Sequence, residues 1–356
     1  MTTVRCPICL HEFPWKRARL VSLDENTGAA RELVREDGES DTRWRHRLTF
    51  AYRECPGERP PHHLPHEYGE YEGRVVIGMI GTAVAGKTHL LAAMIGEFAR
   101  TAHLPEVGLR VEEFHPFLHR DYMKTVVEPF LARREQLTRT SHDAIGYVDT
   151  LKVTNVDRPR PARYAVTFFD VAGEVQERSG EAVRFLGAVN ALIFIVDPMR
   201  VGGLGAPEKE RAAGDPTFGN ALRTLEHTLN PEKRPLLPLP AAFVVNKADL
   251  LRHRGFAAVD RWMSRDGEDF HLGTVERESA DAYTFLATHG ASRWASAASR
   301  FADSTLHFAS ATGVSAEGDY FPERGFQPRR VLKPLLSLLA MKGVVDPGML
   351  GREESC

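Results

Sequence analysis

The chain of 356 residues has few cysteines, no excess of basic residues and no long apolar run. None of its apolar runs approaches the roughly 18 residues that a membrane-spanning helix needs. Its first residues also lack the apolar core of a secretion signal. A formal net charge of −2 provides no general attraction for nucleic acid. We therefore expect a cytoplasmic protein without a transmembrane segment or a nucleic-acid partner, formed as one large domain with insertions or as two domains.

The four cysteines are unevenly placed. Cys6, Cys9 and Cys55 lie near the start of the chain, and Cys356 is the last residue. In a reducing compartment such cysteines are metal ligands or core residues more often than disulfides. Cys6-Pro-Ile-Cys9 has the two-residue spacing of a zinc knuckle, in which two thiolates bind one ion. We interpret residues 1–72 as a small zinc-ribbon-like module with a linker.

The second half of this zinc pattern is incomplete. Cys55 is followed by Pro and Gly, but Glu58 stands where a second knuckle would have its cysteine. A histidine would have to be the fourth ligand, and the candidates are His62, His63 and His66, of which we take His62. Three cysteines and one histidine are an ordinary set for structural zinc. The alternative is a metal-free module whose cysteines are remnants.

Residues 74–94 contain a phosphate-binding loop. Gly81-Thr-Ala-Val-Ala-Gly86-Lys87-Thr88 matches GxxxxGK(S/T), with an apolar run before it and helically spaced apolar residues after it. A strand, a glycine loop and a helix in this order place backbone N–H groups around phosphates. Lys87 would reach the β- and γ-phosphates, and the Thr88 hydroxyl would bind magnesium. The alternative, a chance glycine-rich turn, does not explain the two flanks.

A second phosphate motif follows a predicted hairpin over residues 147–154 and 163–169. Asp170-Val-Ala-Gly173-Glu174 is a DxxG sequence at the end of an apolar strand. An Asp at this place can hold magnesium through water, and the Gly173 N–H can approach a γ-phosphate. The motif is weak alone, but its position after a phosphate loop makes it informative.

A third motif selects the base. The apolar run 241–245 delivers Asn246-Lys247-Ala248-Asp249, an NKxD sequence. A carboxylate there can accept from guanine N1–H and the 2-amino group, a donor pair that adenine lacks. Another predicted strand ends in Ser310-Ala311, whose backbone can contact the base O6. The sequence therefore predicts binding of GTP and GDP in preference to ATP.

These motifs predict a three-layer α/β domain over residues 73–345, with a mostly parallel sheet, inserted helices and a flexible tail over 346–356. The insertions are expected at about 104–146, 200–218 and 255–300. The first is long for an α/β connection. Helices are expected within 104–146, near Leu222, over 278–289, over 294–301 and from Val331 to Leu339.

GTAVAGKT, DVAG, NKAD and SAT have the order and spacing of the motifs of small Ras-like (TRAFAC-class) P-loop GTPases, which residues 74 to about 342 resemble. The CPxC sequence, the long segment before the hairpin and the RVLKPLLSLLA ending are similar to the bacterial double-GTPase group. That group is associated with conflict or defence gene clusters. The resemblance implies a GTPase that needs magnesium and acts on a protein partner.

Residue by residue, the resemblance makes Lys87 the catalytic phosphate charge, Thr88 a magnesium ligand and Asp170 the outer-sphere magnesium carboxylate. Gly173 becomes the γ-phosphate sensor at the start of a second switch. A first-switch threonine, also a magnesium ligand, would be Thr140 or Thr138. The base would be held by Asn246, Lys247 and Asp249, with Ser310 and Ala311.

Glu174 departs from the family pattern, which often has a water-orienting Gln directly after DxxG. Its charge is unfavourable near the γ-phosphate, so we expect slow intrinsic hydrolysis. An arginine from a partner, or Arg133, Arg134 or Arg139, could supply the missing positive charge. We predict a GTP-hydrolysing switch that acts on an unidentified protein. The alternatives are a GTP-binding adaptor with negligible hydrolysis and, less favoured, a P-loop ATPase.

Overall fold

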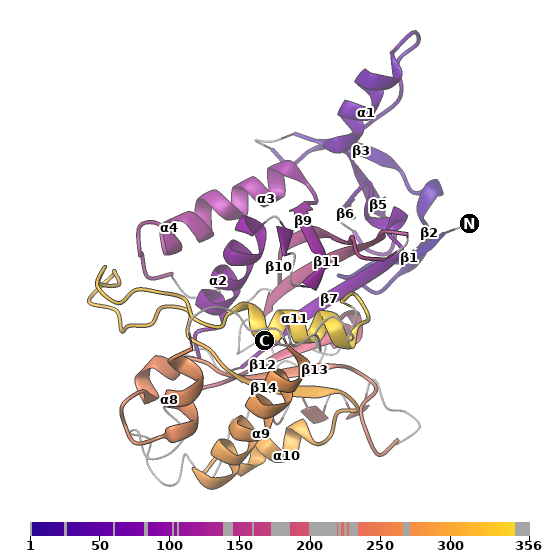
Figure 1. Cartoon of the computed structure of the whole chain (residues 1–356). Helices are drawn as coiled ribbons and strands as arrows, with labels where there is room; N and C mark the ends of the chain where they lie inside the picture. Colours follow the sequence, from indigo (N-terminus) through magenta and orange to yellow (C-terminus); the bar gives the residue numbers. More distant parts are fainter. Residues whose placement is uncertain are drawn as a thin grey trace.

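A computed structural model describes most of the chain (Figure 1). The described residues are 2–24, 27–59, 61–81, 85–101, 103–104, 107–137, 145–158, 160–171, 186–198, 219, 222–223, 226–227, 234–265 and 271–345.

An eight-stranded sheet forms the centre of the molecule, in the order β14-β13-β12-β7-β11-β10-β9-β8. Its parallel strands are β7 (Gly73–Ile80), β11 (Ala162–Val171), β12 (Ala191–Val196), β13 (Ala241–Val245) and β14 (Ser304–Phe308). The carboxyl ends of parallel strands share one edge of a sheet, which is where such sheets bind ligands. The predicted phosphate, magnesium and base motifs all follow these strands at that edge.

The remaining strands run antiparallel to their neighbours. β10 (Ile145–Asn155) pairs with β11, which confirms the predicted hairpin, and the ladder continues to β9 (Leu109–Glu113) and β8 (His103–Leu104). Part of the segment 104–146, expected as an insertion, thus also extends the sheet through β9. Leu109 and Val111 are buried and alternate with exposed residues, a pattern of five residues that is easily overlooked.

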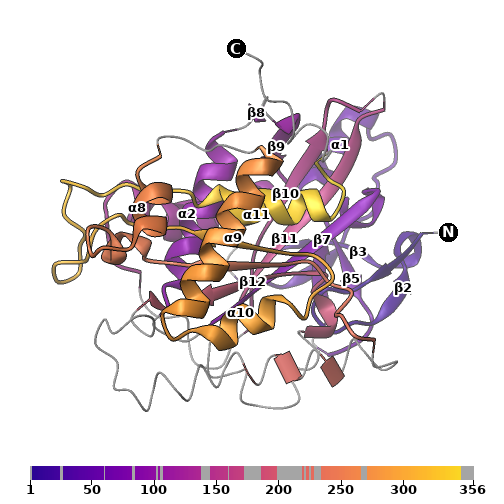
Figure 2. The ribbon, with the colours of Figure 1, turned by 60° about the horizontal axis from the view of Figure 1, so that its bottom comes forward.

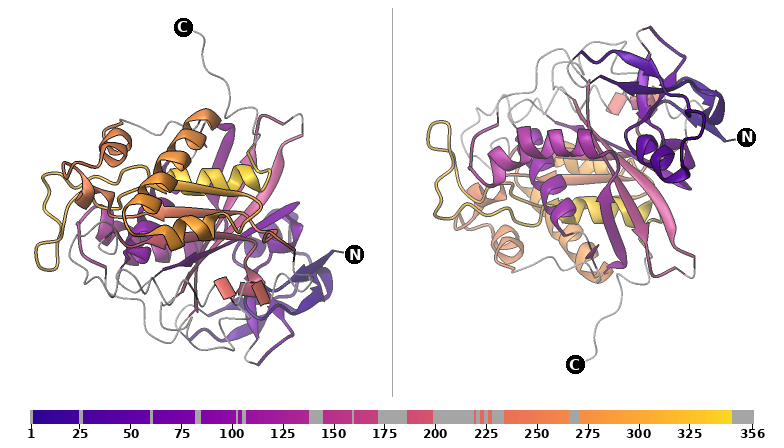
Figure 3. Two further views of the ribbon diagram at one scale, coloured as in Figure 1. Left: turned by 90° about the horizontal axis from the view of Figure 1, so that it is seen from below. Right: turned by 90° about the horizontal axis from the view of Figure 1, so that it is seen from above.

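Helices cover both faces of the sheet, as expected for a three-layer α/β domain. One face packs against α2 (Lys87–Arg100), α4 (Glu128–Leu131) and α11 (Leu332–Met341). The other packs against α8 (Ala257–Met263), α9 (Leu272–Thr288) and α10 (Ser292–Ala298). Figure 2 and the left view of Figure 3 show α9 and α10 over the sheet, and the right view of Figure 3 shows the side with α2 and α4. The predicted helices over 278–289, 294–301 and 331–339 are confirmed.

The first of the expected insertions also contains one long helical segment. It runs through α3 (Pro116–Tyr122), a π-helical turn over Met123–Val127, and α4. The second expected insertion, over 200–218, lies outside the described residues. No helix among the described residues is long and apolar enough to cross a membrane.

Residues before β7 build the smaller N-terminal module. Its strands are β1 (Thr3–Arg5), β2 (Glu12–Pro14), β3 (Leu20–Leu23), β4 (Ala30–Glu32), β5 (Tyr52–Cys55) and β6 (His62–Pro65), with α1 (Asp41–Thr49) projecting from one end. β1 pairs with β2, and the other four strands form a sheet in the order β4-β3-β5-β6. Phe114 and Ala165 of the central sheet region belong to the same apolar cluster as Phe13 and Trp15. The module is therefore packed onto the larger domain through a shared core.

Candidate functional site

Glycines shape the phosphate loop between β7 and α2. Gly86 precedes the helix with a φ of 80°, in the left-handed region that favours glycine. A Cβ at Gly86 would lie 2.7 Å from Asn246 Nδ2, and one at Gly81 would lie 2.9 Å from the Ile195 carbonyl oxygen. Lys87 crosses the loop, and its Nζ donates to Gly81 O at 2.7 Å. The ammonium therefore lies beside Gly81 at the start of the loop motif, where it could reach bound phosphates.

The two predicted magnesium ligands with described side chains lie next to each other. Thr88, in the first turn of α2, donates from Oγ1 to Asp170 Oδ2 at 2.9 Å. Asp170 near the end of β11 is 4% exposed. Magnesium prefers oxygen ligands and keeps several waters, so a hydroxyl beside a carboxylate fits this ion. Gly173, Glu174, Thr138 and Thr140 lie outside the described residues.

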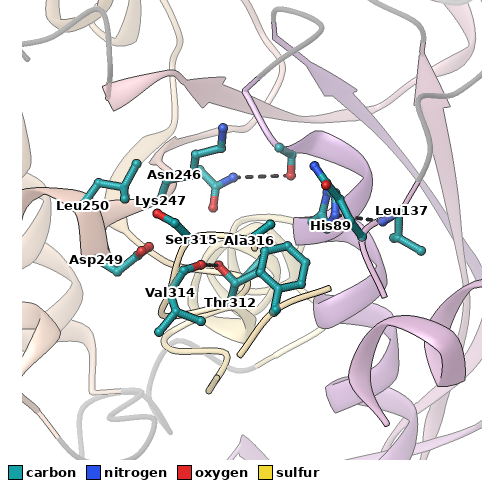
Figure 4. Close-up of a pocket in the computed structure, with 14 residues that line it drawn as sticks. His89, Leu137, Asn246, Lys247, Asp249, Leu250, Thr312, Val314, Ser315 and Ala316 are labelled. Atoms are coloured by element: carbon teal, nitrogen blue, oxygen red, sulfur yellow. Dashed lines mark hydrogen bonds between the residues drawn. The ribbon is translucent and has the colours of Figure 1, made fainter. Parts of the chain in front are cut away.

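A cavity of about 360 Å³ opens beside the phosphate loop. Figure 4 shows Asn246 and Asp249 on one side of it, and His89 and Leu137 on the other. The predicted site residues that line it are Gly86, Asn246, Lys247, Asp249 and Ala311. The phosphate loop, the NKxD sequence and the SAT loop are far apart in the sequence. The structure brings residues of all three to one cavity.

Asn246 joins the base motif to the phosphate loop. Its Nδ2 donates to Ala85 O at 2.8 Å and to Gly86 O at 3.3 Å, across 160 residues of sequence. Lys247, in the left-handed region with a φ of 52°, then turns the chain into the short 3-10 helix η7 (Ala248–Leu251). This turn carries Asp249 to the cavity wall. Asn246 is therefore a structural tie between the two motifs as well as a lining residue.

Asp249 is oriented by Ser310. The Ser310 hydroxyl donates to Asp249 Oδ1 at 2.5 Å, and it accepts from Gly313 N at 2.8 Å. Burial raises the pKa of Asp249, while the hydrogen bond from Ser310 and the charge of Lys247 favour its carboxylate. The sequence predicted a backbone contact for Ser310. The structure shows a further side-chain role, because the Ser310 hydroxyl holds the Asp249 carboxylate at the cavity wall.

Several cavity residues were not predicted from the sequence. His89 follows the GKT sequence directly, and Gln136, Leu137 and Phe321 come from segments with no recognisable motif. Among these four residues, only His89 could have been found from its place in the sequence. It comes three residues after Gly86 and thus on the helical face above the loop. The other three depend on long-range packing.

The predicted zinc ligands form a compact cluster in the N-terminal module. Ligand atoms of Cys6, Cys9, Cys55 and His62 all lie within 4.8 Å of one another. Cys6 Sγ is 3.7 Å from His62 Nδ1, and Cys9 Sγ is 3.5 Å from Cys55 Sγ. Tetrahedral zinc with bonds of about 2.3 Å to sulfur separates its ligand atoms by about 3.8 Å. The donor set and spacing therefore fit zinc.

Strand pairing explains which histidine joins this cluster. Cys55 ends β5 and His62 begins β6, and the two residues are partners in the antiparallel ladder. His63 points elsewhere, because neighbouring residues of a strand face opposite sides. Its Nε2 lies 3.5 Å from Glu54 Oε1. His62 is thus the histidine that the structure brings to the three cysteines.

Comparisons with known proteins give only distant likenesses. No protein-family model matches the chain, and no curated protein matches it. The Saccharomyces cerevisiae Ski7 GTPase-like domain bound to GDP and inorganic phosphate is similar, with 12% identity and a TM-score of 0.36 over 76% of this chain and 51% of that chain. The same domain bound to GTP shows 12% identity and a TM-score of 0.34, over 80% and 52%. Sup35 with GDP shows 11% identity and a TM-score of 0.27, over 74% and 44%.

This chain thus spans about half the length of the solved chains that it matches. Scores this low do not bear on function.

Proposed function

We propose that this protein binds GTP and GDP with magnesium and hydrolyses GTP slowly, as a switch for an unidentified protein partner. The observation that supports this most directly is the convergence of Gly86, Asn246 and Asp249 on one cavity. A phosphate loop alone would also suit an ATPase. Asp249, held by Ser310 at the cavity wall, offers the acceptor that guanine needs and adenine does not use.

The phosphate end of the site follows from the same geometry. Lys87 would exchange its bond to Gly81 O for the β- and γ-phosphates. Thr88 and Asp170 would hold magnesium, which neutralises charge on the phosphates when it is bound. The backbone N–H groups at the start of α2 would face the same anion, where the helix dipole favours negative charge.

The rate of hydrolysis depends on Glu174, which stands where a water-orienting Gln is common. A carboxylate beside the γ-phosphate disfavours the developing charge unless a cation compensates it. We expect turnover to be slow alone and faster with a partner that supplies an arginine, an effect of about 10³ to 10⁵ in related reactions. The competing hypothesis is an adaptor that binds GTP without turning it over.

The N-terminal module is proposed to hold one structural zinc ion through Cys6, Cys9, Cys55 and His62. We further propose that the chain is related to the bacterial double-GTPase group, on the basis of its motifs and the CPxC sequence.

Base selectivity tests the central proposal. We expect purified protein to bind GDP at least about a hundredfold more tightly than ADP, because unpaired buried donors and acceptors are costly. Asp249→Asn should weaken GDP binding and favour xanthosine diphosphate, whose 2-position carries a carbonyl oxygen. Asp303→Asn, an exposed position before β14, is the matched control. Equal affinity of the wild type for GDP and ADP would refute the assignment.

Turnover separates the switch from the adaptor. Single-turnover release of phosphate should be measurable in the wild type and should accelerate in Glu174→Gln, since the substitution removes the unfavourable charge. Absence of turnover in both proteins, with normal GTP binding, would favour the adaptor.

A further inference from the structure

Two segments that are distant in sequence close one side of the cavity. Gln136 N donates to Asp319 O at 2.7 Å, and Phe321 N donates to Arg134 O at 2.8 Å. Between these bonds, Glu135 and Tyr320 face each other as antiparallel partners. We call residues 134–137 together with residues 317–321 the clasp. Its first segment follows α4, and its second follows the SAT loop.

His89 connects the clasp to the phosphate-loop helix. Leu137 N donates to His89 Nε2 at 3.1 Å, so this ring nitrogen is the acceptor and the imidazole is neutral. Burial and then the charge of Lys247 lower the pKa of His89 to about 4, which agrees with a neutral ring. The ring centroid lies 5.1 Å from that of Phe130 and 5.7 Å from that of Phe321. One side chain of α2 thus contacts both the first clasp segment and a residue of the second.

The clasp forms a wall of the proposed nucleotide site. Gln136, Leu137 and Phe321 line the cavity, and Figure 4 shows Leu137 across it from Asn246 and Asp249. Figure 4 shows the bond between His89 and Leu137 on this side. A ligand in the cavity would therefore lie between the base motif and the clasp. Opening the clasp requires the loss of the two backbone bonds, the bond to His89 and the packing of Phe321 on Phe130.

We propose that the clasp is a gate for guanine-nucleotide exchange, and that His89 is the positioning residue that holds it shut over bound nucleotide. The inference rests on the proposed function, because it names what controls release from that same site. Opening the gate would speed release and binding alike, whereas loss of Asp249 would alter base preference. The two roles can thus be measured separately.

A reversible cross-link tests the gate directly. Glu135 and Tyr320 are a non-hydrogen-bonded antiparallel pair, for which Cα atoms are about 4.5 Å apart, within the range of a disulfide. Glu135→Cys with Tyr320→Cys, in a zinc-loaded Cys356→Ser background, would be loaded with a fluorescent GDP analogue and then oxidised. Release after dilution into excess GDP should be at least about tenfold slower than after reduction with dithiothreitol, because the barrier to opening is raised. The single Glu135→Cys variant should show no redox effect.

Substitutions at His89 test the positioning role. His89→Leu keeps apolar volume beside Phe130 and Phe321 but removes the acceptor for Leu137 N. It should speed release about tenfold, in line with a lost hydrogen bond to a partly buried N–H group. His89→Gln offers a side-chain acceptor again and should restore slow release. If His89 acted through packing alone, release would instead be slow in His89→Leu. Preference for GDP over ADP should stay unchanged in both variants.

Three results would overturn the inference. They are equal release from the oxidised and the reduced double variant, failure of the two cysteines to cross-link, and slow release from His89→Leu. A wild type that binds no guanine nucleotide would instead refute the proposed function itself, and this is measured before any variant is made.

Discussion

Ser310 donates a hydrogen bond to Asp249 Oδ1 at 2.5 Å, joining two motifs that lie 61 residues apart. Ser310 is fully buried after β14, and its hydroxyl also accepts from Thr312 N and Gly313 N. The hydroxyl therefore fixes the SAT loop and the Asp249 carboxylate at once. In the proposed function, guanine recognition would depend on this pair rather than on Asp249 alone.

Ser310→Ala should weaken GDP binding about tenfold, because Asp249 loses the hydroxyl that donates to its Oδ1 and the loop loses an acceptor. Binding of ADP, which does not use the carboxylate, should change little. Titration calorimetry with both nucleotides measures the effect. Ser296→Ala, at an exposed position of α10 away from the cavity, is the control and should bind GDP normally. If both variants behave alike, the Ser310 hydroxyl has no special part in recognition.

Lys87→Ala should reduce affinity for GTP and GDP by more than about a hundredfold, since it removes the charge that faces the phosphates. The domain should stay folded, because the Nζ contacts a loop carbonyl and not the apolar core. Binding of a fluorescent GDP analogue and the melting temperature of nucleotide-free protein measure the two effects. Lys124→Ala, exposed on the π-helical turn, serves as the control. Affinity within about threefold of the wild type would contradict the phosphate-loop role.

The elements that could be predicted are those whose pattern is local. β7, β12 and β13 are short, continuous apolar runs typical of buried parallel strands, and motifs mark their carboxyl ends. The order of those motifs then brings Gly86, Asn246 and Asp249 together, because parallel strands share an edge. The cysteine spacing likewise predicted three members of the metal cluster.

What could not be predicted depends on distant contacts. β9 is a strand of only five residues between β10 and the two-residue edge strand β8, and its pairing with β10 is needed to recognise it. The clasp consists of backbone bonds between segments about 180 residues apart, and backbone bonds leave no trace in residue type. The sequence offers no physical reason to choose His62 among the three candidate histidines, and the register of β5 and β6 supplies that reason by pairing it with Cys55.

A buried ionic network predicts how stability depends on pH. Glu278 of α9 accepts from Phe308 N at 3.0 Å, lies 3.0 Å from His307 Nδ1 and pairs with Arg330 at 2.8 Å. Burial opposes its ionisation, but His307, Arg330 and the Phe308 N–H outweigh burial and lower the pKa of Glu278 to about 2. The network attaches α9 to β14, just before the SAT loop.

Because the folded-state pKa of Glu278 is below its unfolded value, its contribution is fully present above about pH 4.5. It is lost as the pH falls from there toward 2. The difference in unfolding free energy between the wild type and Glu278→Gln should therefore shrink over this range. Urea unfolding at several pH values measures it, with exposed Glu276→Gln as the control. A difference that does not vary between pH 6 and pH 3 would contradict this account of Glu278.

Zinc should bind to the N-terminal module in one equivalent, and the ligand geometry predicts which substitutions remove it. Cys6→Ser and His62→Ala each remove one of four clustered donors, so metal content should fall below about half an equivalent. His63→Ala is the matched control, because His63 faces Glu54 and lies outside the cluster. Metal analysis of each purified variant decides which histidine is the fourth zinc ligand. Loss of zinc in His63→Ala with retention in His62→Ala would show that the fourth ligand is assigned wrongly.

Removal of zinc should loosen residues 1–72 and leave GDP binding within about threefold of the metal-bound protein. The module packs on Ala165 of β11, five residues before Asp170, which corresponds to about 17 Å along a strand. Loss of the metal should therefore expose Phe13 and Trp15 without moving Thr88 or Asp170. Limited proteolysis with and without chelator, together with GDP titration of the same samples, measures both effects. Strongly weakened GDP binding after chelation would show that the shared core carries the effect of the metal to the nucleotide site.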